Sequence, residues 1–308
     1  MIKGENAKGN FISVIITAYN RKEFLLDSIK SAVNQTLRRD FYEIIVINNF
    51  IDGKIDKYML DNNIKNIKME GKVGEFLHAG IMNAKGNIIS FLDDDDQFTN
   101  EKLEFVYNNF RGRVVYIHNG FVAIGKDGNR IDFNNTGVDF NLSCISVRRH
   151  IINKNLENIE AMPDTFMFLS ALDSGRIFKT NNSLTIYRVH DKNTSINYSA
   201  ADGKNIYKRY IASYKQFCNF FSKRVRKTIR GRITEYSIEL YLRGELIRVN
   251  KIFNYIFNNN SGLSIVHRIK MTVAFQLFRF NFGRQIIESK MEAILNAKLG
   301  RLKVRQQM

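Results

Sequence analysis

The sequence predicts an α/β fold with a mostly parallel, doubly wound central sheet flanked by helices. Short apolar runs rich in β-branched residues alternate with segments whose apolar residues recur at helical spacing. The runs contain few polar residues, which is typical of strands covered on both faces of a parallel sheet. One run, residues 87–92, leads directly into four aspartates, which places polar side chains where a strand leaves the sheet.

The first part of the chain repeats a strand and helix unit. The expected strands are residues 11–17, 43–47, 64–69 and 87–92, and the expected helices are residues 21–36, 73–85 and 99–110. Asn20 stands where it can cap the first of these helices. Right-handed crossovers between parallel strands bring the carboxyl ends of the strands to one edge of the sheet.

The pattern changes after residue 110, where strands follow one another more directly. The expected elements are strands at residues 114–118, 121–125, 131–133, 142–147 and 183–189, with a hairpin turn at residues 126–129. Pro163 opens a further helix, which we expect to end at a capping Gly175. The sequence therefore predicts antiparallel strands added to the parallel sheet.

The four aspartates Asp93, Asp94, Asp95 and Asp96 form the most distinctive motif of the chain. Adjacent carboxylates repel one another unless a cation or solvent relieves them. Mg²⁺ and Mn²⁺ prefer oxygen ligands and often combine one or two protein carboxylates with water and phosphate oxygens. A solvated acidic loop is the alternative, but the position directly after a buried strand favours a divalent metal.

The formal net charge of +17 is concentrated in the C-terminal third of the chain. Residues 1–199 contain 25 Lys and Arg against 24 Asp and Glu, whereas residues 200–308 contain 22 against 6. The C-terminal part also has apolar residues at helical spacing, which predicts a basic amphipathic helical region. Such a region can lie on an anionic membrane surface, pack with a solvated basic face, or bind nucleic acid. Its phenylalanines favour the membrane surface, and nucleic acid is the least favoured partner.

Two cysteines, Cys144 and Cys218, are too few for a disulfide framework and indicate a reducing compartment. The first ten residues lack the apolar core of a signal peptide, and no run reaches about 18 apolar residues. We therefore expect a cytoplasmic protein that does not span a membrane. Peripheral attachment to the inner face of the cell membrane is compatible with this expectation.

Five segments follow one another in a characteristic order. They are SVIITAYNR, EIIVINN, GIMNAKGNIISFLDDDD, MPDTFMFLSAL and SLTIYRVHDKNTS. In this register they resemble the family 2 glycosyltransferases of the GT-A fold, over roughly residues 11–198. The resemblance implies a GT-A domain at residues 1–198, with a nucleotide-sugar-binding half (11–118) and an acceptor and catalytic half (119–198). The basic amphipathic helical region then occupies residues 199–308.

The resemblance also implies roles for individual residues. The nucleotide-binding residues that it implies are Thr17, Ala18, Tyr19, Asn20, Asn48, Asp93 and Asp94. Asp93 and Asp95 correspond to the DxD pair, in which Asp95 is the expected ligand of the Mg²⁺ or Mn²⁺ that bridges the diphosphate. His190 falls where some members add a metal or diphosphate contact, and Asp164 falls at the position of the general base.

Three positions, at two places in the chain, depart from the family pattern. Asn48 and Asn49 replace an Asp pair, and an amide can both donate and accept a hydrogen bond, so the base preference stays open. Leu77 replaces an arginine expected near the phosphates. His78, Lys72 or a residue of the basic C-terminal region is then a candidate to supply the missing cation.

The resemblance implies a metal-dependent inverting glycosyltransferase that moves a sugar from a nucleotide-diphosphate sugar to a hydroxyl of a glycan or lipid-linked glycan. The metal would stabilise the departing diphosphate, and Asp164 would accept the hydroxyl proton. An Asp after a Pro is also a common helix cap, so a structural role for Asp164 is the alternative. The departures from the pattern leave a second class open, a weak or inactive module that binds sugar nucleotides or glycans.

Overall fold

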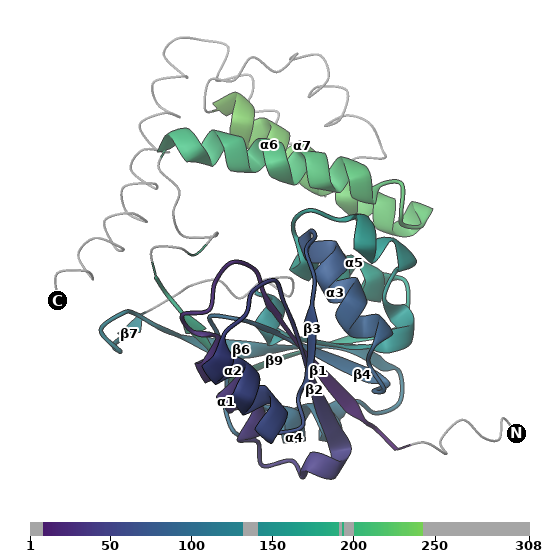
Figure 1. Ribbon diagram of the computed structural model, residues 1–308. Helices are drawn as coiled ribbons and strands as arrows, with labels where there is room; N and C mark the ends of the chain where they lie inside the picture. The colour runs from purple at the N-terminus through teal and green to yellow at the C-terminus, as the bar shows by residue number, and fades with distance from the viewer. Residues whose placement is uncertain (1–8, 132–140, 191–192, 194–199, 243–308) are drawn as a thin grey trace, which may run out of the picture. The chain divides into compact units, whose positions relative to one another are not determined.

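The computed structural model describes residues 9–131, 141–190, 193 and 200–242 (Figure 1). The chain divides into two compact units, Met1–Asn197 and Tyr198–Met308. The first unit contains a mixed α/β arrangement, and the described residues of the second are helical. The predicted α/β fold is confirmed, and the predicted C-terminal helical region is described only over residues 200–242, which form α6 and α7 with a short turn between them.

A nine-stranded sheet forms the centre of the first unit, with strand order β3-β2-β1-β4-β8-β6-β9-β5 and β7 paired to β6. The strands are β1 (Ile12–Ala18), β2 (Tyr42–Asn48), β3 (Lys65–Lys68), β4 (Ile88–Asp93), β5 (Gln97–Phe98), β6 (Val114–Ile124), β7 (Arg130–Ile131), β8 (Ile145–Arg148) and β9 (Arg176–Arg188). Strands β3, β2, β1 and β4 are mutually parallel, whereas β8 is antiparallel to β4 and β6. The parallel half with antiparallel additions is therefore as the sequence predicts.

Helices cover both faces of the parallel half (Figure 1). They are α1 (Leu25–Val33), α2 (Gly53–Asp61), α3 (Val73–Met82), α4 (Lys102–Asn109) and α5 (Pro163–Leu172). Alternate residues of β1 point to opposite faces, so Val14 and Ile16 join the core that includes buried residues of α1, α2 and α4. On the other face, α3 approaches β1 so closely that a Cβ on Gly80 would lie 2.7 Å from Ile15 Cγ2. This close approach leaves no room for a side chain at Gly80, so α3 packs directly on the sheet.

Several element boundaries differ from the sequence prediction. Asn20 does not cap α1, because the N-cap is Phe24, without a side-chain cap bond, and Asn20 adopts a left-handed conformation with φ 52°. Gly175 is not the C-cap of α5, which ends earlier with Asp173 in that position. The two strands predicted at residues 114–118 and 121–125 form the single strand β6, with register irregularities where it pairs with β9.

Two further segments also differ. The segment at residues 142–147 begins with a 3-10 turn at Leu142–Cys144 and becomes strand only from Ile145. Strand β9 begins at Arg176, before the predicted residue 183. Its pairing with β6 extends the strand through a polar stretch that has little strand signal of its own.

The second unit contains two described helices, α6 (Ala200–Phe217) and α7 (Lys223–Leu242). The ring of Tyr236 in α7 lies 5.4 to 5.9 Å from three tyrosine rings of α6, those of Tyr207, Tyr210 and Tyr214. These three positions recur at helical spacing, so aromatic packing joins the two helices. The phenylalanines between residues 275 and 282 that suggested a membrane surface lie outside the described residues.

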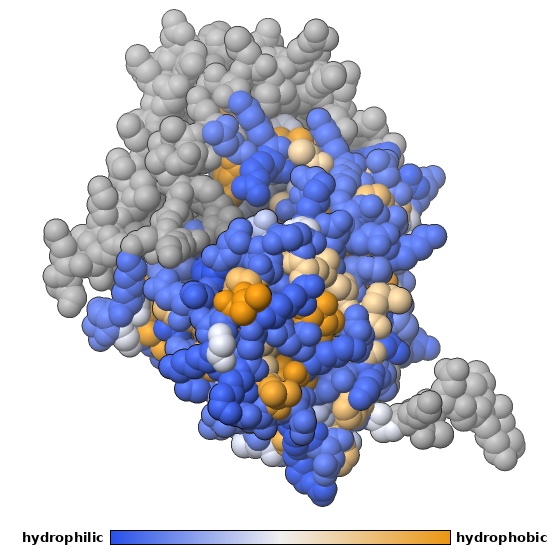
Figure 2. All heavy atoms as spheres, viewed as in Figure 1, coloured by the Kyte–Doolittle hydropathy of each residue, from blue (hydrophilic) through white to orange (hydrophobic). Residues whose placement is uncertain are grey.

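The described surface is mainly polar. Figure 2 shows a predominantly hydrophilic face on which hydrophobic residues form small, separate patches. The exposed large hydrophobic residues in the described part of the chain are Tyr19, Ile51, Leu60 and Met82. Within that same part, no helix combines the length and the apolar character that a membrane crossing requires.

Candidate active site

The carboxyl ends of three neighbouring strands bring the predicted nucleotide-binding residues together. In the parallel register, Thr17 of β1 lies opposite Asp93 of β4, and Ala18 lies opposite Asn48 of β2. Thr17 is half-buried, whereas Ala18 and Asn48 are fully buried. The end of β1 therefore lies between an acidic strand end on one side and an amide-bearing strand end on the other.

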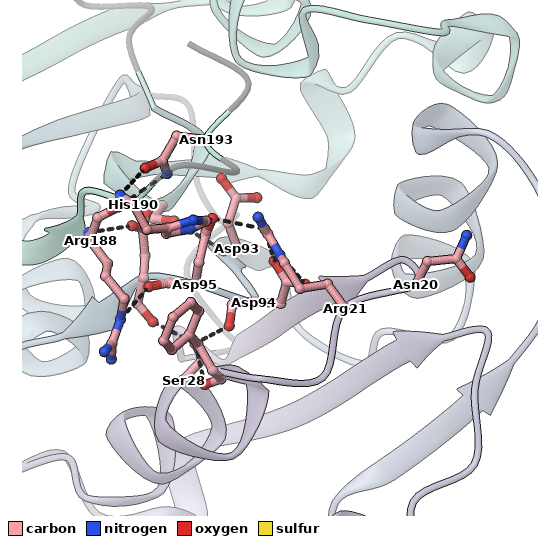
Figure 3. A network of polar contacts seen from close by, with 12 residues as sticks. Asn20, Arg21, Ser28, Asp93, Asp94, Asp95, Arg188, His190 and Asn193 are labelled. Atoms are coloured by element: carbon pink, nitrogen blue, oxygen red, sulfur yellow. Dashed lines mark hydrogen bonds and ion pairs between the residues drawn. The ribbon is translucent and has the colours of Figure 1, made fainter. Parts of the chain in front are cut away.

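Arg21 is a cation that contacts the acidic strand end directly. Its Nε lies 3.0 Å from Asp94 Oδ2, and its Nη2 contacts Asp94 Oδ1 and lies 2.8 Å from Asp95 Oδ2 (Figure 3). The guanidinium is a planar fork whose donors match two carboxylate oxygens at once. One residue thus offsets much of the repulsion between two neighbouring aspartates.

His190, near the C-terminal end of the first unit's sequence, also contacts Asp95. Its Nε2 lies 3.0 Å from Asp95 Oδ2, and both side chains are more than nine-tenths buried. The backbone N–H of His190 donates to Asn193 Oδ1, while the Asn193 amide donates to the carbonyl of Arg188 at 3.0 Å. The ring of Phe24 lies 5.2 Å from the imidazole. The segment after β9 is therefore held with His190 directed at Asp95 (Figure 3).

Asp96 supports the acidic loop from inside the protein. It is 1% exposed, and its carboxylate accepts from Asn141 Nδ2 at 2.9 Å and from the backbone N–H of Arg188 at 3.1 Å. The Arg188 side chain donates to the carbonyl of Asp95 at 3.1 Å, and Ser28 Oγ donates to the carbonyl of Asp96 at 2.6 Å. Asp96 is therefore a buried anchor, whereas Asp95 is the member of the run that both Arg21 and His190 contact.

Burial and mutual repulsion alter the titration of this cluster. Burial, followed by the charges of Asp96, Asp95, Asp94 and Asp164, raises the pKa of Asp93 well above its ordinary value. Burial also raises the pKa of Asp94 to about 6, although the Arg21 guanidinium acts in the opposite direction. For Asp96, burial and the neighbouring Asp95 raise the pKa to about 7. Removing negative charge from this cluster, or adding a cation to it, is therefore favourable.

Asp164 lies in the first turn of α5, close enough for its charge to affect Asp93. The N-cap of this helix is Met162 in the left-handed conformation, so Asp164 is not the N-cap residue. Its Oδ1 accepts from the backbone N–H of Thr165 at 2.7 Å, and the residue is half-buried. The end of β4 and the start of α5 thus place Asp93, predicted to bind the nucleotide as part of the DxD pair, and Asp164, predicted for proton transfer, in one region.

The loop after β1 contributes Tyr19 and Asn20, but in different ways. Tyr19 is 53% exposed, and its ring meets the ring of Phe76 at the start of α3, with centroids 5.7 Å apart. Asn20 lies apart from the acidic cluster (Figure 3) and exchanges two 2.8 Å hydrogen bonds with the side chain of Asn49. Asn20 and Asn49 therefore join the loops after β1 and β2.

The donor set at Asp95 fits a divalent cation. The carboxylate oxygen of Asp95 and the imidazole nitrogen of His190 converge, and both atom types bind Mn²⁺ or Mg²⁺. The described residues contain no group of three or more His, Cys, Asp or Glu side chains arranged for a metal. A cation here would have two protein ligands and would take its other ligands from a diphosphate and water, as magnesium sites commonly do.

Sequence reasoning did not assign a role to the basic residues of this site. Arg21 pairs with Asp94, and the Arg188 side chain donates to the carbonyl of Asp95. The amide of Asn193 in turn donates to the carbonyl of Arg188. From the sequence, Arg21 was expected only at the start of a helix and Arg188 only in the last strand. A signal did exist for Arg21, because it directly follows the loop predicted to line the nucleotide pocket, and four adjacent carboxylates require a counter-charge. The candidates for the missing arginine have other partners, since Lys72 pairs with Glu160 and His78 lies 3.5 Å from Glu157.

Comparison with known proteins identifies the family. The family model described as glycosyl transferase family 2 matches residues 13–169, which are half of the chain. The chain belongs to glycosyl transferase family 2. This family 2 glycosyltransferase shares its fold with S. aureus TarS in complex with UDP, at a TM-score of 0.55 and 14% identity over 97% of this chain and 92% of that one. The mannosyltransferase PcManGT from Pyrobaculum calidifontis, solved with GDP-Man and Mn²⁺, gives a TM-score of 0.55 at 11% identity, covering 96% and 88% of the two chains. The expected GT-A fold is therefore confirmed.

Relatives found by sequence align with only part of this family 2 glycosyltransferase. An uncharacterized glycosyltransferase of Rickettsia bellii is 32% identical in an alignment of 141 residues that covers 41% of this chain and 19% of that protein. A second one, from Rickettsia typhi, is 29% identical and is covered to 42% of its length. The match spans much less than the full length of these relatives. WfaP of Escherichia coli, named UDP-Glc:alpha-D-GlcNAc-diphosphoundecaprenol beta-1,3-glucosyltransferase, is 28% identical over 60% of this chain and 80% of its own.

Proposed function

We propose that this protein is a metal-dependent, inverting glycosyltransferase that uses a nucleoside diphosphate sugar and a hydroxyl acceptor. The observation that carries the proposal is the convergence of Arg21 Nη2 and His190 Nε2 on Asp95 Oδ2, at 2.8 and 3.0 Å. This carboxylate lies just beyond a parallel strand, at the sheet edge where open α/β folds bind ligands. A fold-level likeness alone would not separate transfer from binding, but this arrangement supports the chemistry of a diphosphate leaving group.

The chain's own residues divide the work between two ends of the sugar. Asp95 and His190 would hold a Mg²⁺ or Mn²⁺ ion, which when bound supplies Lewis-acid stabilisation of the departing diphosphate. Thr17, Asp93 and Asp94 lie around the same strand ends and are proposed to position the nucleotide. Asp164 would take the proton from the attacking hydroxyl, on the side of the sugar opposite the leaving group, so that the anomeric centre inverts.

Arg21 is proposed to take the role of the arginine that the family pattern has at the position of Leu77. Leu77 is fully buried in α3 and presents no polar group, whereas the Arg21 guanidinium already lies against Asp94 and Asp95. When a metal neutralises these carboxylates, the guanidinium is available to a phosphate oxygen within the reach of its side chain. Arg21 is thus proposed as a phosphate contact in the occupied site and a counter-charge in its absence.

The acceptor is proposed to be a glycan or a lipid-linked glycan. The relative WfaP is named for transfer of glucose from UDP-Glc to a sugar on diphosphoundecaprenol. A carboxylate at the general-base position also favours a hydroxyl, because a phosphate acceptor is already ionised near neutral pH and needs no base. Contact of the basic region, residues 199–308, with an anionic membrane surface at the cytoplasmic side would bring the enzyme to such an acceptor.

The test is Asp95→Asn in the full-length protein, with binding of nucleoside diphosphates measured by calorimetry with Mn²⁺ and with EDTA. Wild type is expected to bind at least one nucleotide in a Mn²⁺-dependent manner, and the variant is expected to lose that dependence. Asp61→Asn is a matched control, since Asp61 is an exposed residue at the end of α2. Metal-dependent binding that survives Asp95→Asn would exclude this residue as the ligand. Binding without turnover on any donor and acceptor would favour the alternative of an inactive sugar-nucleotide-binding module.

A further inference from the structure

Three arginines lie together at the edge of the sheet opposite the acidic run. Strand β8 is antiparallel to both β4 and β6, and β9 is parallel to β6, so β4, β6 and β9 run in the same direction. The amino ends of β6 and β9 are therefore at the edge away from the carboxyl end of β4. A hollow of about 680 Å³ at these amino ends is lined by Arg111, Gly112, Arg113, Val114, Gly175 and Arg176. We call Arg111, Arg113 and Arg176 the arginine cluster.

Two short loops bring the arginine cluster together. In the loop before β6, Arg111 and Arg113 flank Gly112, whose φ of 56° is a conformation that favours glycine. In the loop before β9, Gly175 comes so close to the first loop that a Cβ there would lie 2.8 Å from the carbonyl oxygen of Arg113. The backbone N–H of Arg176 donates to that same oxygen at 2.8 Å. The backbone therefore fixes the three arginines around one hollow.

The arginine cluster has no counter-charge among the described residues. Its three members are exposed, and their side chains form no hydrogen bond or ion pair within the described part of the chain. The residues that line the hollow include no Asp or Glu. By contrast, the exposed Arg38 pairs with Asp40. Arg148 of β8 adds a further cation, which donates to the carbonyl of Phe110, directly before the cluster in sequence, and to Asn10 Oδ1. Like charges gathered in this way repel one another, and an anion relieves that repulsion.

We propose that the arginine cluster is a binding site for a phosphate group, separate from the nucleotide site. A guanidinium donates two parallel hydrogen bonds to phosphate oxygens. A phosphate monoester has three terminal oxygens and nearly two negative charges, so it matches three guanidiniums better than a carboxylate, with two oxygens and one charge. The backbone N–H groups of Gly112 and Gly175 have no hydrogen-bond partner among the described residues and are further donors on the same loops.

The inference goes beyond the proposed function, since it adds a second ligand and takes no part in the transfer step. A phosphate group can reach the hollow from two sources. One is the headgroup of an anionic lipid, and the other is inorganic phosphate or a soluble phosphate ester. Both present the same oxygens to the arginine cluster, so separate experiments are needed to distinguish them.

The first experiment measures binding of inorganic phosphate to the full-length protein by calorimetry in EDTA, with acetate at the same ionic strength for comparison. The test variant combines Arg111→Gln, Arg113→Gln and Arg176→Gln, which removes the charges and keeps polar side chains. Wild type should bind phosphate more tightly than acetate. The glutamine variant should lose about tenfold or more of the phosphate affinity, as expected when charge-assisted hydrogen bonds are lost.

Two further variants separate a built site from diffuse positive charge. Arg38→Gln, Lys54→Gln and Lys57→Gln together remove the same charge from exposed positions outside the hollow, and this control should bind phosphate as wild type does. Lysine at all three cluster positions keeps the charge but loses the planar fork, so its phosphate affinity should lie between those of wild type and the glutamine variant. Melting curves check that each variant is folded, and Mn²⁺-dependent nucleotide binding should be unchanged in all of them.

The second experiment measures flotation with phosphatidylcholine vesicles, with and without phosphatidic acid, whose headgroup is a phosphate monoester. All variants keep residues 199–308, so any contribution of that region is common to them. Weaker binding of the glutamine variant to phosphatidic acid vesicles, relative to the control, would identify a lipid headgroup as a ligand. Loss confined to inorganic phosphate would identify a soluble phosphate or phosphate ester.

The inference is overturned if the glutamine variant keeps wild-type binding of both inorganic phosphate and the vesicles. It is also overturned if the control loses as much binding as the glutamine variant, or if acetate binds as tightly as phosphate, because diffuse charge would then explain the result. Failure of nucleoside diphosphates to bind any of the proteins with Mn²⁺ would instead overturn the proposed function and leave the phosphate site intact.

Discussion

The two strand ends that flank β1 differ in how their polar groups are satisfied. At the end of β4, charged carboxylates have charged or hydrogen-bonding partners from distant segments, including Arg21, His190 and Asn141. At the end of β2, the amide of Asn48 donates to Asn66 Oδ1 at 3.2 Å, while Asn48 Oδ1 has no hydrogen-bond partner among the described residues. At the first end, protein partners offset the charge of the carboxylates only in part, because the pKa values of Asp93, Asp94 and Asp96 stay raised, whereas the second end keeps one unpaired acceptor.

This difference indicates how each end would respond to a ligand. A cation at Asp95, as proposed, would compete with Arg21, and the acidic end would then exchange one counter-charge for another. A hydrogen-bond donor that reached Asn48 Oδ1 would displace no hydrogen bond of that oxygen to the described residues. We therefore expect the end of β2 to discriminate between ligands by their hydrogen-bonding groups. Ligand binding at the end of β4 should instead depend on ionic strength.

The largest expected effect concerns the base proposed beside the acidic end. Asp164→Asn removes basicity and keeps the oxygen that accepts from Thr165, so folding should persist. Turnover should fall by roughly 10² to 10⁴-fold with donor binding near normal, as is typical of a lost general base. Single-turnover transfer measures the effect, and Asp173→Asn at the exposed end of the same helix is the control. Transfer within about threefold of wild type would instead indicate a structural Asp164, since a general base contributes far more.

A smaller effect is expected from Arg21→Ala, which tests whether Arg21 is the counter-charge of the acidic end. Losing a charge-assisted hydrogen bond costs about 1.5 to 3 kcal/mol, so the melting temperature should fall by several degrees. Added Mn²⁺ should raise the melting temperature of the variant more than that of wild type, because the carboxylates then lack their protein cation.

Arg38→Ala is the matched control for this change. Arg38 pairs with Asp40 at 2.5 Å, but the two side chains are 76% and 70% exposed, so the pair contributes less than about 1 kcal/mol. An equal response of both variants to Mn²⁺ would mean that Arg21 does not compete with the metal. The comparison between a compensated and an incomplete strand end would then no longer hold.

The last expected effect concerns Lys102, which lies behind the acidic end. It is fully buried, its Nζ contacts Asn119 Oδ1, and burial lowers its pKa to about 8. Between about pH 8 and the ordinary lysine pKa of about 10.4, the unfolded chain keeps a proton that the folded protein has lost, so stability gains with rising pH. Lys102→Met removes this contribution.

Melting temperatures of wild type and Lys102→Met across this pH window measure the effect. The wild-type value minus the variant value should rise between about pH 8 and pH 10, by about 2 to 4 °C for each kcal/mol gained. A constant difference would show that the amine remains charged inside the protein. Lys102 Nζ also approaches the carbonyl of Ser143, and the hydroxyl of Ser143 accepts from the backbone N–H of Asp93. A charged Lys102 would therefore be a further cation behind the acidic run.

The sequence by itself determined the elements whose signal is local. Apolar runs and helical spacing identified the strands β1, β2 and β4, the helices α1 and α3, and the position of the aspartates after a strand. These signals depend on side-chain period and burial, which a contiguous segment carries within itself. The motif order also led to the correct family, while the roles of Asp164, Asp95 and His190 in metal binding and catalysis stay predictions.

Only the tertiary structure decided which side chains meet. The contact of His190 with Asp95 and that of Arg21 with Asp94 depend on strand order and loop paths, not on spacing along the chain. The same reason explains Asn20, which bonds to Asn49 across two loops although its local sequence suggested a helix cap. The acceptor at Asn48 is the clearest case, since an amide reads the same in sequence whichever way it is turned. Its orientation follows from the Asp56 carboxylate in α2 acting through the Asn66 amide in β3, and only folding brings these groups into line.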